Sequence, residues 1–335
     1  MSGECICQWH DLPAELKVEV LRYLPFQSIM RFMLLSRESY FLASQAKIKV
    51  FKVQYRGRNQ CHILSIAWAK HEKESYSWYE VEILQNSAEG SVIIDSKGRR
   101  IYCENDADSV GMQVLFHYTK LFDVQDVEIE ELVMSSGLYC MLHGQLDGLT
   151  LHAKRFTLST NDNQLISSLI PFLPSHLSSI VIYTVHLSLN VITTTISSDV
   201  FEHEAVRTAR ELNTESFSAD LSDKQICNLK ASTLCVSSPH ITSRSINQMI
   251  LQWFKGEREI NLIAISTNGD LSWSQLLNEI DPERIQAGSP HGNPDVVAKV
   301  LHSDHGNIYI AVCDNYCEMG RPRCCFVRYI PHIIR

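Results

Sequence analysis

Residues 12–26 read LPAELKVEVLRYLPF, and this stretch decides the fold of the N-terminal part of the chain. Pro13 suits the first turn of a helix, where its missing N–H would have no intrahelical partner. Glu15 then lies near the positive end of the helix dipole. Pro25 ends the helix, because the residue before a proline is pushed out of the α region. Apolar residues at helical spacing form one stripe, comprising Leu16, Val20, Leu21 and Leu24.

Two further short helices are predicted after this one. Ser28 can cap a second helix and Ser36 a third, because a serine hydroxyl accepts a hydrogen bond from a free N–H of the first turn. Their apolar residues are Ile29, Phe32 and Met33 in the second, and Tyr40, Phe41 and Leu42 in the third. Three such helices are too small to bury a self-sufficient core, so the unit needs a partner.

The pattern resembles the F-box, the small helical module of ubiquitin-ligase receptors, from Leu12 to Ser44. One departure is visible, since Ser39 stands where the family often has tryptophan or another bulky residue, and Tyr40 is the candidate to fill that space. The alternative is an ordinary helical hairpin at the start of a globular domain. The matching residues are Leu12-Pro13, Glu15-Leu16, Leu21, Leu24-Pro25-Phe26 and Leu35-Ser36-Arg37.

The resemblance implies that these helices dock on the adaptor subunit of a Skp–cullin–F-box ubiquitin ligase. The docking residues that it implies are Leu12, Pro13, Glu15, Leu16, Val20, Leu21, Leu24, Pro25, Leu35, Ser36 and Arg37.

Composition indicates a folded protein, with 335 residues, 45% hydrophobic and 20% charged. The net charge is −8, and residues 1–47 carry equal numbers of basic and acidic side chains, so the acidic excess lies in the remainder. An acidic main domain argues against nonspecific binding of nucleic acid or of an anionic membrane as its role.

Residues 1–10 have neither the basic nor the apolar region of a secretory signal. The most apolar stretch, 169–192, is broken by Pro171, Pro174 and His176, which argues against a membrane span. Eleven cysteines are scattered along the chain, an odd number that favours reduced thiols. We therefore expect a cytoplasmic or nuclear protein that is not secreted.

Residues 48–104 alternate in a way that is typical of an antiparallel β meander, with a glycine-containing turn at 95–98. A helix over 110–122 and a strand over 127–134 follow. Beyond these, strands alternate with helices, and strand starts recur about every 25–30 residues. The strands are predicted near 149–158, 179–185, 208–217, 232–236 and 260–265, and the helices near 163–173, 200–205, 223–229 and 242–255.

This spacing predicts an α+β or α/β fold, in which a three-helix module precedes a mixed strand–helix domain with parallel strands. The strand period is that of a leucine-rich-repeat-like solenoid, with the meander at its start. Residues 221–262 and the terminal hairpin at 305–312 also resemble the F-box-associated region of nematode F-box proteins. That resemblance implies a substrate- or partner-binding domain and names no particular target.

The sequence gives only weak evidence for catalytic or metal-binding groups. Cys313, Cys317, Cys324 and Cys325, near His302, His305 and His332, lack the paired C-x-x-C spacing of a structural zinc site, and buried thiols explain them as well. Cys140 and His143 could be drawn as nucleophile and base, but no orienting acid or oxyanion loop can be identified beside them.

Each of two charged clusters has a functional interpretation and a simpler one as exposed, solvated surface. Residues 97–100 (KGRR) could bind phosphate, and the polar tip of a hairpin is the simpler interpretation. An acidic cluster could attract a basic partner, although such a run is more often a solvated face. Its members are Asp123, Asp126, Glu128, Glu130 and Glu131.

We therefore expect an adaptor and not an enzyme, with no metal and no cofactor. Residues 8–47 would form the docking module, and residues 48–335 would bind an unknown target protein. The alternatives are an F-box interaction protein outside any cullin ligase, and an enzyme or zinc protein that uses the C-terminal Cys/His set.

Overall fold

The computed structural model divides the chain into two compact units, Met1–Lys154 and Arg155–Arg335. No helix in the described ranges is both long enough and apolar enough to span a lipid bilayer. The described residues are 9–24, 26–33, 35–46, 49–58, 60–69, 76–87, 90–124, 128–136, 152–175, 177–184, 195–288, 297–313 and 315–321.

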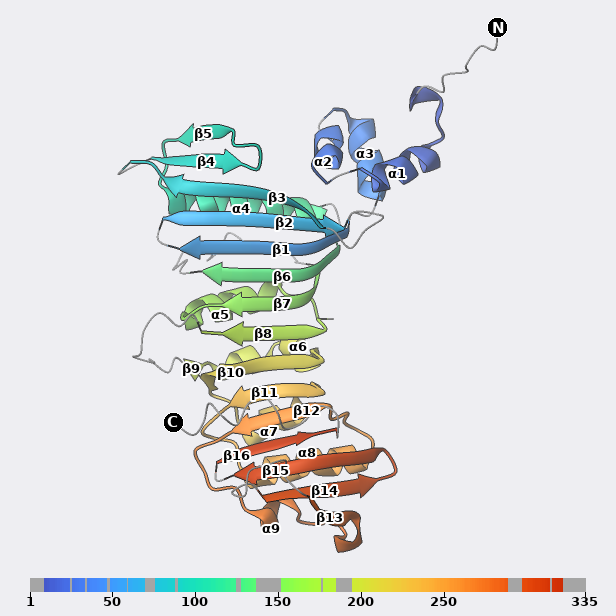
Figure 1. Cartoon of the computed structure of the whole chain (residues 1–335), viewed down its shortest axis with the longest axis vertical. Coiled ribbons are helices and arrows are strands. Elements are labelled where there is room, and N and C mark those ends of the chain that lie inside the picture. Colours follow the sequence, from blue (N-terminus) through green and yellow to red (C-terminus); the bar gives the residue numbers. More distant parts are fainter. Residues whose placement is uncertain are drawn as a thin grey trace. The chain divides into compact units, whose positions relative to one another are not determined.

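The first unit begins with helices and continues with strands, as predicted (Figure 1). Its elements are η1 (Trp9–Asp11), α1 (Ala14–Arg22), α2 (Phe26–Met33), α3 (Arg37–Gln45), β1 (Lys49–Arg58), β2 (Cys61–Ala69), β3 (Tyr76–Gln85), β4 (Ser91–Asp95), β5 (Arg100–Cys103), α4 (Ala107–Val124) and β6 (Glu128–Ser136).

Strands β1 to β5 pair antiparallel in succession, which confirms the predicted meander. Strand β6 pairs parallel to β1 on its other edge, so the order is β6-β1-β2-β3-β4-β5. The turn between β4 and β5 contains Gly98 at a φ of 75°, a backbone conformation that glycine adopts without steric cost.

Helix α4 covers one face of the meander, where it contacts β1 to β4 (Figure 1). The core there comprises Val81, Ile83, Ala107 and Val110. Because side chains alternate along a strand, the odd-numbered residues of β3 face α4 and the even-numbered ones point away from it.

A buried polar array also joins α4 to the sheet. His62 of β2 has almost no accessible surface, and its Nδ1 lies 2.9 Å from the Tyr55 hydroxyl of β1. Its Nε2 lies 2.6 Å from a carboxylate oxygen of Asp108 in α4. Burial, with the nearby Asp108 charge, raises the pKa of Tyr55, which keeps its hydroxyl protonated. A Cβ added at Gly111 would lie 2.6 Å from the His62 ring, so this position needs glycine.

The second unit alternates strands and helices and then ends in antiparallel strands. Its elements are β7 (Ala153–Ser159), α5 (Asn163–Leu169), η2 (Ile170–Phe172), β8 (Ser179–Tyr183), β9 (Thr195–Ile196), η3 (Ser198–Glu202), α6 (Glu204–Thr208), β10 (Glu211–Ala219), α7 (Asp223–Asn228), β11 (Thr233–Ser237), α8 (Ser243–Phe254), β12 (Leu262–Ser266), α9 (Trp273–Leu276), η4 (Pro282–Arg284), β13 (Ile285–Gly288), β14 (Val297–Ser303), β15 (Gly306–Cys313) and β16 (Tyr316–Gly320).

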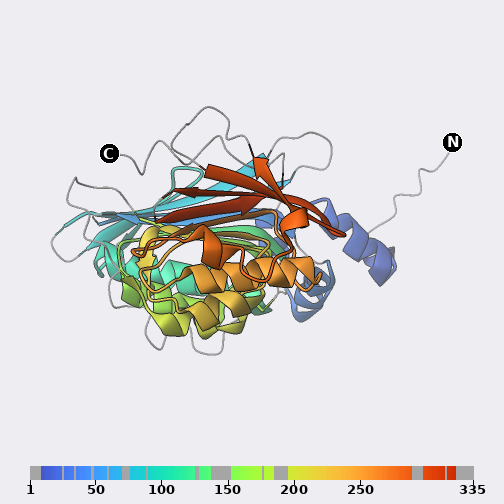
Figure 2. The same ribbon diagram turned by 90° about the horizontal axis from the view of Figure 1, so that it is seen from below.

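The strand–helix–strand connections of this unit give parallel pairing, as predicted. Strands β7, β8, β10, β11 and β12 are parallel neighbours in that order, and β9 pairs with β10. The sheet then becomes antiparallel, because β16 pairs with β12 and is followed by β15, β14 and β13. The helices of this unit, coloured yellow-green to orange, lie on one side of its strands in Figure 2.

Helix α8 follows its sequence signals closely. The Thr242 hydroxyl caps it by accepting a hydrogen bond from the Arg244 N–H, and Gly256, at a φ of 73°, follows its end. Ile246, Met249 and Ile250 are buried along one face. The helix predicted near 242–255 is therefore confirmed, with the bounds Ser243–Phe254.

Arg258 is a buried cation that fixes the end of α7 in the second unit. It is only 8% exposed, and its guanidinium donates to the carbonyl oxygens of Cys227 at 2.9 Å and Leu229 at 2.6 Å. A further hydrogen bond of 2.9 Å reaches the side-chain oxygen of Gln252 in α8. Burial lowers the pKa of Arg258, and the helix-end carbonyls compensate the positive charge.

Several boundary predictions are wrong, including the helix near 200–205, which is η3 followed by α6, and three that concern single residues. Pro13 lies at the N-cap of α1 and not in its first turn, a position where a missing N–H also costs nothing. Ser28 does not cap α2, which begins at Phe26, because a proline restricts the residue before it and not the residue after it. Strand β10 begins at Glu211, since Thr208 still belongs to α6, where its hydroxyl donates to the Glu204 carbonyl at 2.7 Å.

Candidate functional site

The candidate site is the three-helix segment at the start of the chain. Helix α3 packs against both α1 and α2. The buried apolar side chains of the segment are Val18, Leu21, Ile29, Met33, Leu42, Ala43 and Ala46. This core uses one side of each helix and leaves the other sides for contacts outside the segment.

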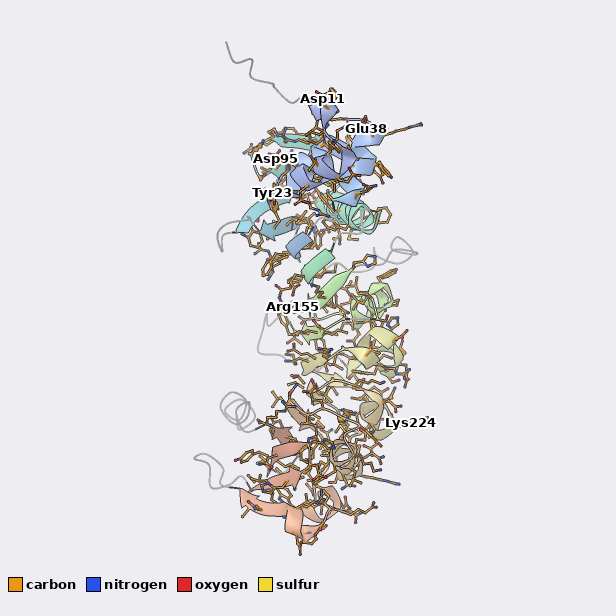
Figure 3. All side chains as sticks on the ribbon, turned by 90° about the vertical axis from the view of Figure 1, so that its right-hand side faces the viewer. Asp11, Tyr23, Glu38, Asp95, Arg155 and Lys224 are labelled. Atoms are coloured by element: carbon orange, nitrogen blue, oxygen red, sulfur yellow. The ribbon has the colours of Figure 1, made fainter. Side chains whose placement is uncertain are left out.

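Polar and aromatic contacts hold the helices together. The ammonium group of Lys17 in α1 lies 3.4 Å from a carboxylate oxygen of Glu38 in α3, and 5.9 Å from the centre of the Trp9 ring. Trp9 also meets Phe32 of α2 edge to face, with ring centres 5.6 Å apart. Figure 3 labels Glu38 and Tyr23 on this segment. These contacts connect all three helices.

Ser36 begins α3 as predicted. Its hydroxyl accepts a hydrogen bond of 3.0 Å from the Ser39 backbone N–H. The Ser39 side chain, at the position where the F-box often has tryptophan, lies 2.9 Å from the same hydroxyl and is buried. Ser39 therefore supports the cap, and the bulky side chains of α3 are those of Tyr40 and Phe41, which follow it.

Replacing Ser36 with alanine is expected to remove this cap and to destabilise α3 by about 1 kcal/mol, because one N–H of the first turn then loses its partner. The measurement is amide hydrogen exchange at Ser39, which should become faster. Ser36→Asp should keep the slow exchange, since a carboxylate is an equally good cap. Unchanged exchange in the alanine variant would contradict the assigned role.

Large apolar side chains remain exposed on these helices. Leu16 is 52% exposed, Leu35 is 74% exposed and Phe41 is 60% exposed. Leu16, Val20 and Tyr23 follow each other at four- and three-residue steps, so they share one face of α1. We call the full set the exposed apolar set, which comprises Leu16, Val20, Tyr23, Leu24, Leu35, Tyr40 and Phe41.

The predicted docking residues divide into different environments. Leu16, Val20, Leu24 and Leu35 belong to the exposed apolar set, while Leu21 is fully buried and supports the helices from inside. Leu12 is half-buried, and Pro25 lies outside the described residues. The remaining predicted residues are exposed, namely Pro13, Glu15, Ser36 and Arg37.

Sequence reasoning did not include Tyr23 among the docking residues, although it is exposed. Its spacing of seven residues from Leu16 places it on the same helical face and could have identified it.

The third helix was predicted to use Tyr40, Phe41 and Leu42 as apolar surface. Only Leu42 is buried, and the two aromatic residues remain accessible.

The C-terminal cysteine set forms no metal site in the part of the chain that the structure describes. Cys313 pairs with Tyr316 and Cys317 pairs with Val312, so the two thiols point to opposite faces of the sheet. Burial, followed by the nearby Glu318, raises the pKa of Cys317 to about 12. The described ranges hold no group of three or more potential metal ligands. Cys324, Cys325 and His332 lie outside those ranges, as do Cys140 and His143.

The charged clusters have partners within the first unit. In the 97–100 turn, the Arg99 side chain donates to an Asp95 carboxylate oxygen at 2.6 Å, and that hydrogen bond lowers the pKa of Asp95. Glu131 lies 3.0 Å from the ammonium group of Lys52, and Glu130 lies 3.2 Å from that of Lys154. Asp126 lies outside the described residues.

Residues 9–51 match the F-box domain family. The match covers α1 to α3 and ends within β1. No curated protein and no solved structure matches the chain significantly. The family assignment therefore applies to the helical segment that carries the exposed apolar set.

Proposed function

We propose, from the F-box domain at residues 9–51, that the chain is a substrate-recognition adaptor of a Skp–cullin–F-box ubiquitin ligase. An F-box domain implies in general a substrate-adaptor role in ubiquitin ligases and binding to a Skp-type adaptor subunit. The finer assignment, that this chain docks through α1 and α3 and holds a target for the ligase, is our proposal.

One observation carries it, the concentration of exposed apolar side chains on the F-box helices. Of the eleven large hydrophobic side chains exposed among the described residues, seven belong to the exposed apolar set. Large exposed apolar patches on soluble proteins mark interaction surfaces. The polar residues interspersed among them, such as Glu15 and Arg37, fit the rim of an interface.

The two parts of the chain have separate roles in this proposal. Residues 8–47 are the docking module, and residues 48–335 bind the target. The succession β10-α7-β11-α8-β12 supports an F-box-associated region like that of nematode F-box proteins. The parallel strand–helix units from β7 to β12 support a leucine-rich-repeat-like character for the second unit.

The mechanism is proximity and requires no catalytic group in this chain. When the target and the ligase are held by one protein, their encounter becomes intramolecular and its effective concentration rises. The charge supports a protein partner, since a net charge of −8 disfavours nucleic acid. The six cysteines described as free thiols fit a reducing compartment such as the cytosol or the nucleus.

A binding experiment tests this role. Purified full-length chain is expected to bind a purified Skp-type adaptor, and the complex is expected to retain a cullin subunit. The double variant Leu12→Ala/Pro13→Ala should bind at least about tenfold more weakly, because two predicted contacts are lost. The measurement is titration calorimetry followed by size-exclusion chromatography with the cullin.

Failure to bind the adaptor, or equal binding by the variant, would overturn the proposed docking. Adaptor binding without cullin would instead support an interaction protein that acts outside a cullin ligase.

A further inference from the structure

The edge strand β5 of the first unit has one edge that no described strand covers. It pairs with β4 and is the last strand in the order of this unit, so no described strand occupies its other edge. In an antiparallel ladder, alternate residues direct their N–H and C=O groups away from the partner strand. Half of the β5 backbone groups are therefore free to pair with another strand.

Two large apolar side chains flank this edge. Ile101 is 61% exposed and Tyr102 is 67% exposed. Ile101 pairs with Ile93, in the row that continues to Ile83 on the α4 face. Tyr102, the next residue, points to the opposite face. Natural edge strands are usually protected by charges, prolines or bulges; β5 carries one charge, Arg100, and presents an exposed apolar side chain on each face.

On the face of the sheet away from α4, Tyr102 is the first residue of a row of apolar side chains. Tyr102 pairs with Val92 of β4, which pairs with Leu84 of β3, which pairs with Cys61 of β2. The row is apolar on four strands; Val92 is buried, Leu84 and Cys61 are half-buried, and Tyr102 is its most exposed member. Antiparallel sheets that face water usually carry polar residues there.

The neighbouring row begins and ends with a positive charge and has Glu82 in its middle. The neighbouring row runs from Arg100 through Ile94, Glu82 and Ile63 to Arg56. Both arginines are exposed, as is Lys97 in the turn, and among the described residues none of these three has an ion-pair partner. Arg99 differs, because Asp95 neutralises it. Arg100 and Lys97 place two exposed cations at the β4–β5 turn, which favours a negatively charged ligand at that end of the edge.

We propose that β5 binds an extended acidic segment of a partner protein, which adds to the sheet as one further strand. Its backbone pairs with the free groups of β5, its apolar side chains contact Ile101, and its carboxylates face Arg100 and Lys97. This mode joins backbone hydrogen bonds, which give affinity, to side-chain contacts at alternate positions, which give specificity. The inference rests on the adaptor role proposed above and names the class of target.

Synthetic peptides test the surface on the full chain. The probe is a fluorescein-labelled decapeptide of alternating glutamate and valine, compared with a lysine–valine counterpart and with a version in which proline replaces alternate valines. Anisotropy is expected to show at least tenfold tighter binding of the acidic peptide than of either comparison peptide. Hydrogen exchange should slow within Arg100–Cys103 when the acidic peptide is bound.

Matched variants separate this edge from general charge. Arg100→Glu should reverse the preference between the acidic and basic peptides, and Tyr102→Ser should weaken binding at least fivefold. Lys224→Glu makes the same kind of charge change on α7 (Figure 3) and should leave binding unchanged.

Equal binding of acidic and basic peptides, no binding, or indifference to Arg100→Glu would overturn the proposal. Concentration-dependent dimerisation that is lost in Arg100→Glu would overturn it in favour of a second copy of this chain as the occupant. Adaptor binding, measured on the same preparations, should be unchanged in all these variants. If the unmodified chain does not bind the adaptor, the adaptor role is refuted, whereas the peptide result still stands.

Discussion

The double substitution Leu16→Glu/Leu35→Glu is expected to weaken binding of a Skp-type adaptor by about a hundredfold or more. Both side chains are more than half exposed, so the free energy of folding should change little. At an interface, removal of a central apolar side chain costs about 2 kcal/mol or more, and the added carboxylates must also be desolvated. The measurement is the dissociation constant by calorimetry, with the unfolding midpoint as a check on the fold.

Trp78→Glu/Tyr183→Glu is the matched control, since it places the same charges on large exposed side chains outside the F-box helices. Adaptor affinity in this control should stay within about threefold of the unmodified chain. Equal losses in both double variants would show that net charge, and not the exposed apolar set, governs docking. Retention of full affinity by the Leu16/Leu35 variant would refute the proposed surface.

Replacing Arg258 with alanine is expected to lower the free energy of unfolding of the second unit by about 3 to 5 kcal/mol. The substitution leaves carbonyl oxygens of Cys227 and Leu229 without the donor that satisfies them, within a buried site. Each buried acceptor left unpaired costs about 1–3 kcal/mol, and the lost packing of the side chain adds to this. Urea denaturation followed by tryptophan fluorescence measures the change.

Arg244→Ala provides the comparison, because Arg244 is an exposed arginine on α8. Its substitution should change the free energy of unfolding by no more than about 0.5 kcal/mol. Similar small effects for Arg258→Ala and Arg244→Ala would show that the carbonyl groups at the end of α7 find other partners.

Local signals in the sequence predicted those elements whose ends are fixed by nearby residues. Helix α8 begins at the Thr242 cap and ends before Gly256, and both depend only on the chain within a few residues. The meander followed from alternation and from the turn at Gly98. The helix predicted from the stripe at Leu16, Val20 and Leu21 is present as α1, which ends at Arg22, before Leu24.

Which helix face is buried, and which distant strands pair, depends on contacts that the local sequence pattern does not specify. Leu16, Val20 and Leu21 all belong to the predicted stripe, yet only Leu21 is buried, because the packing of the other helices selects the covered side. The parallel pairing of β6 with β1 joins distant segments, and nothing near either strand specifies it. The buried role of Arg258 likewise requires the end of α7 to lie beside it.

The pairing of β1 with β6 also affects how the chain is made on the ribosome. Strand β1 begins at Lys49, whereas its parallel partner begins only at Glu128. At about 5–20 residues per second, synthesis leaves one edge of β1 open for roughly 4 to 16 s. The F-box helices contact one another locally and can assemble in that interval. The F-box helices can therefore form before the sheet is closed, while one edge of the nascent β1 stays open to pairing until β6 is made.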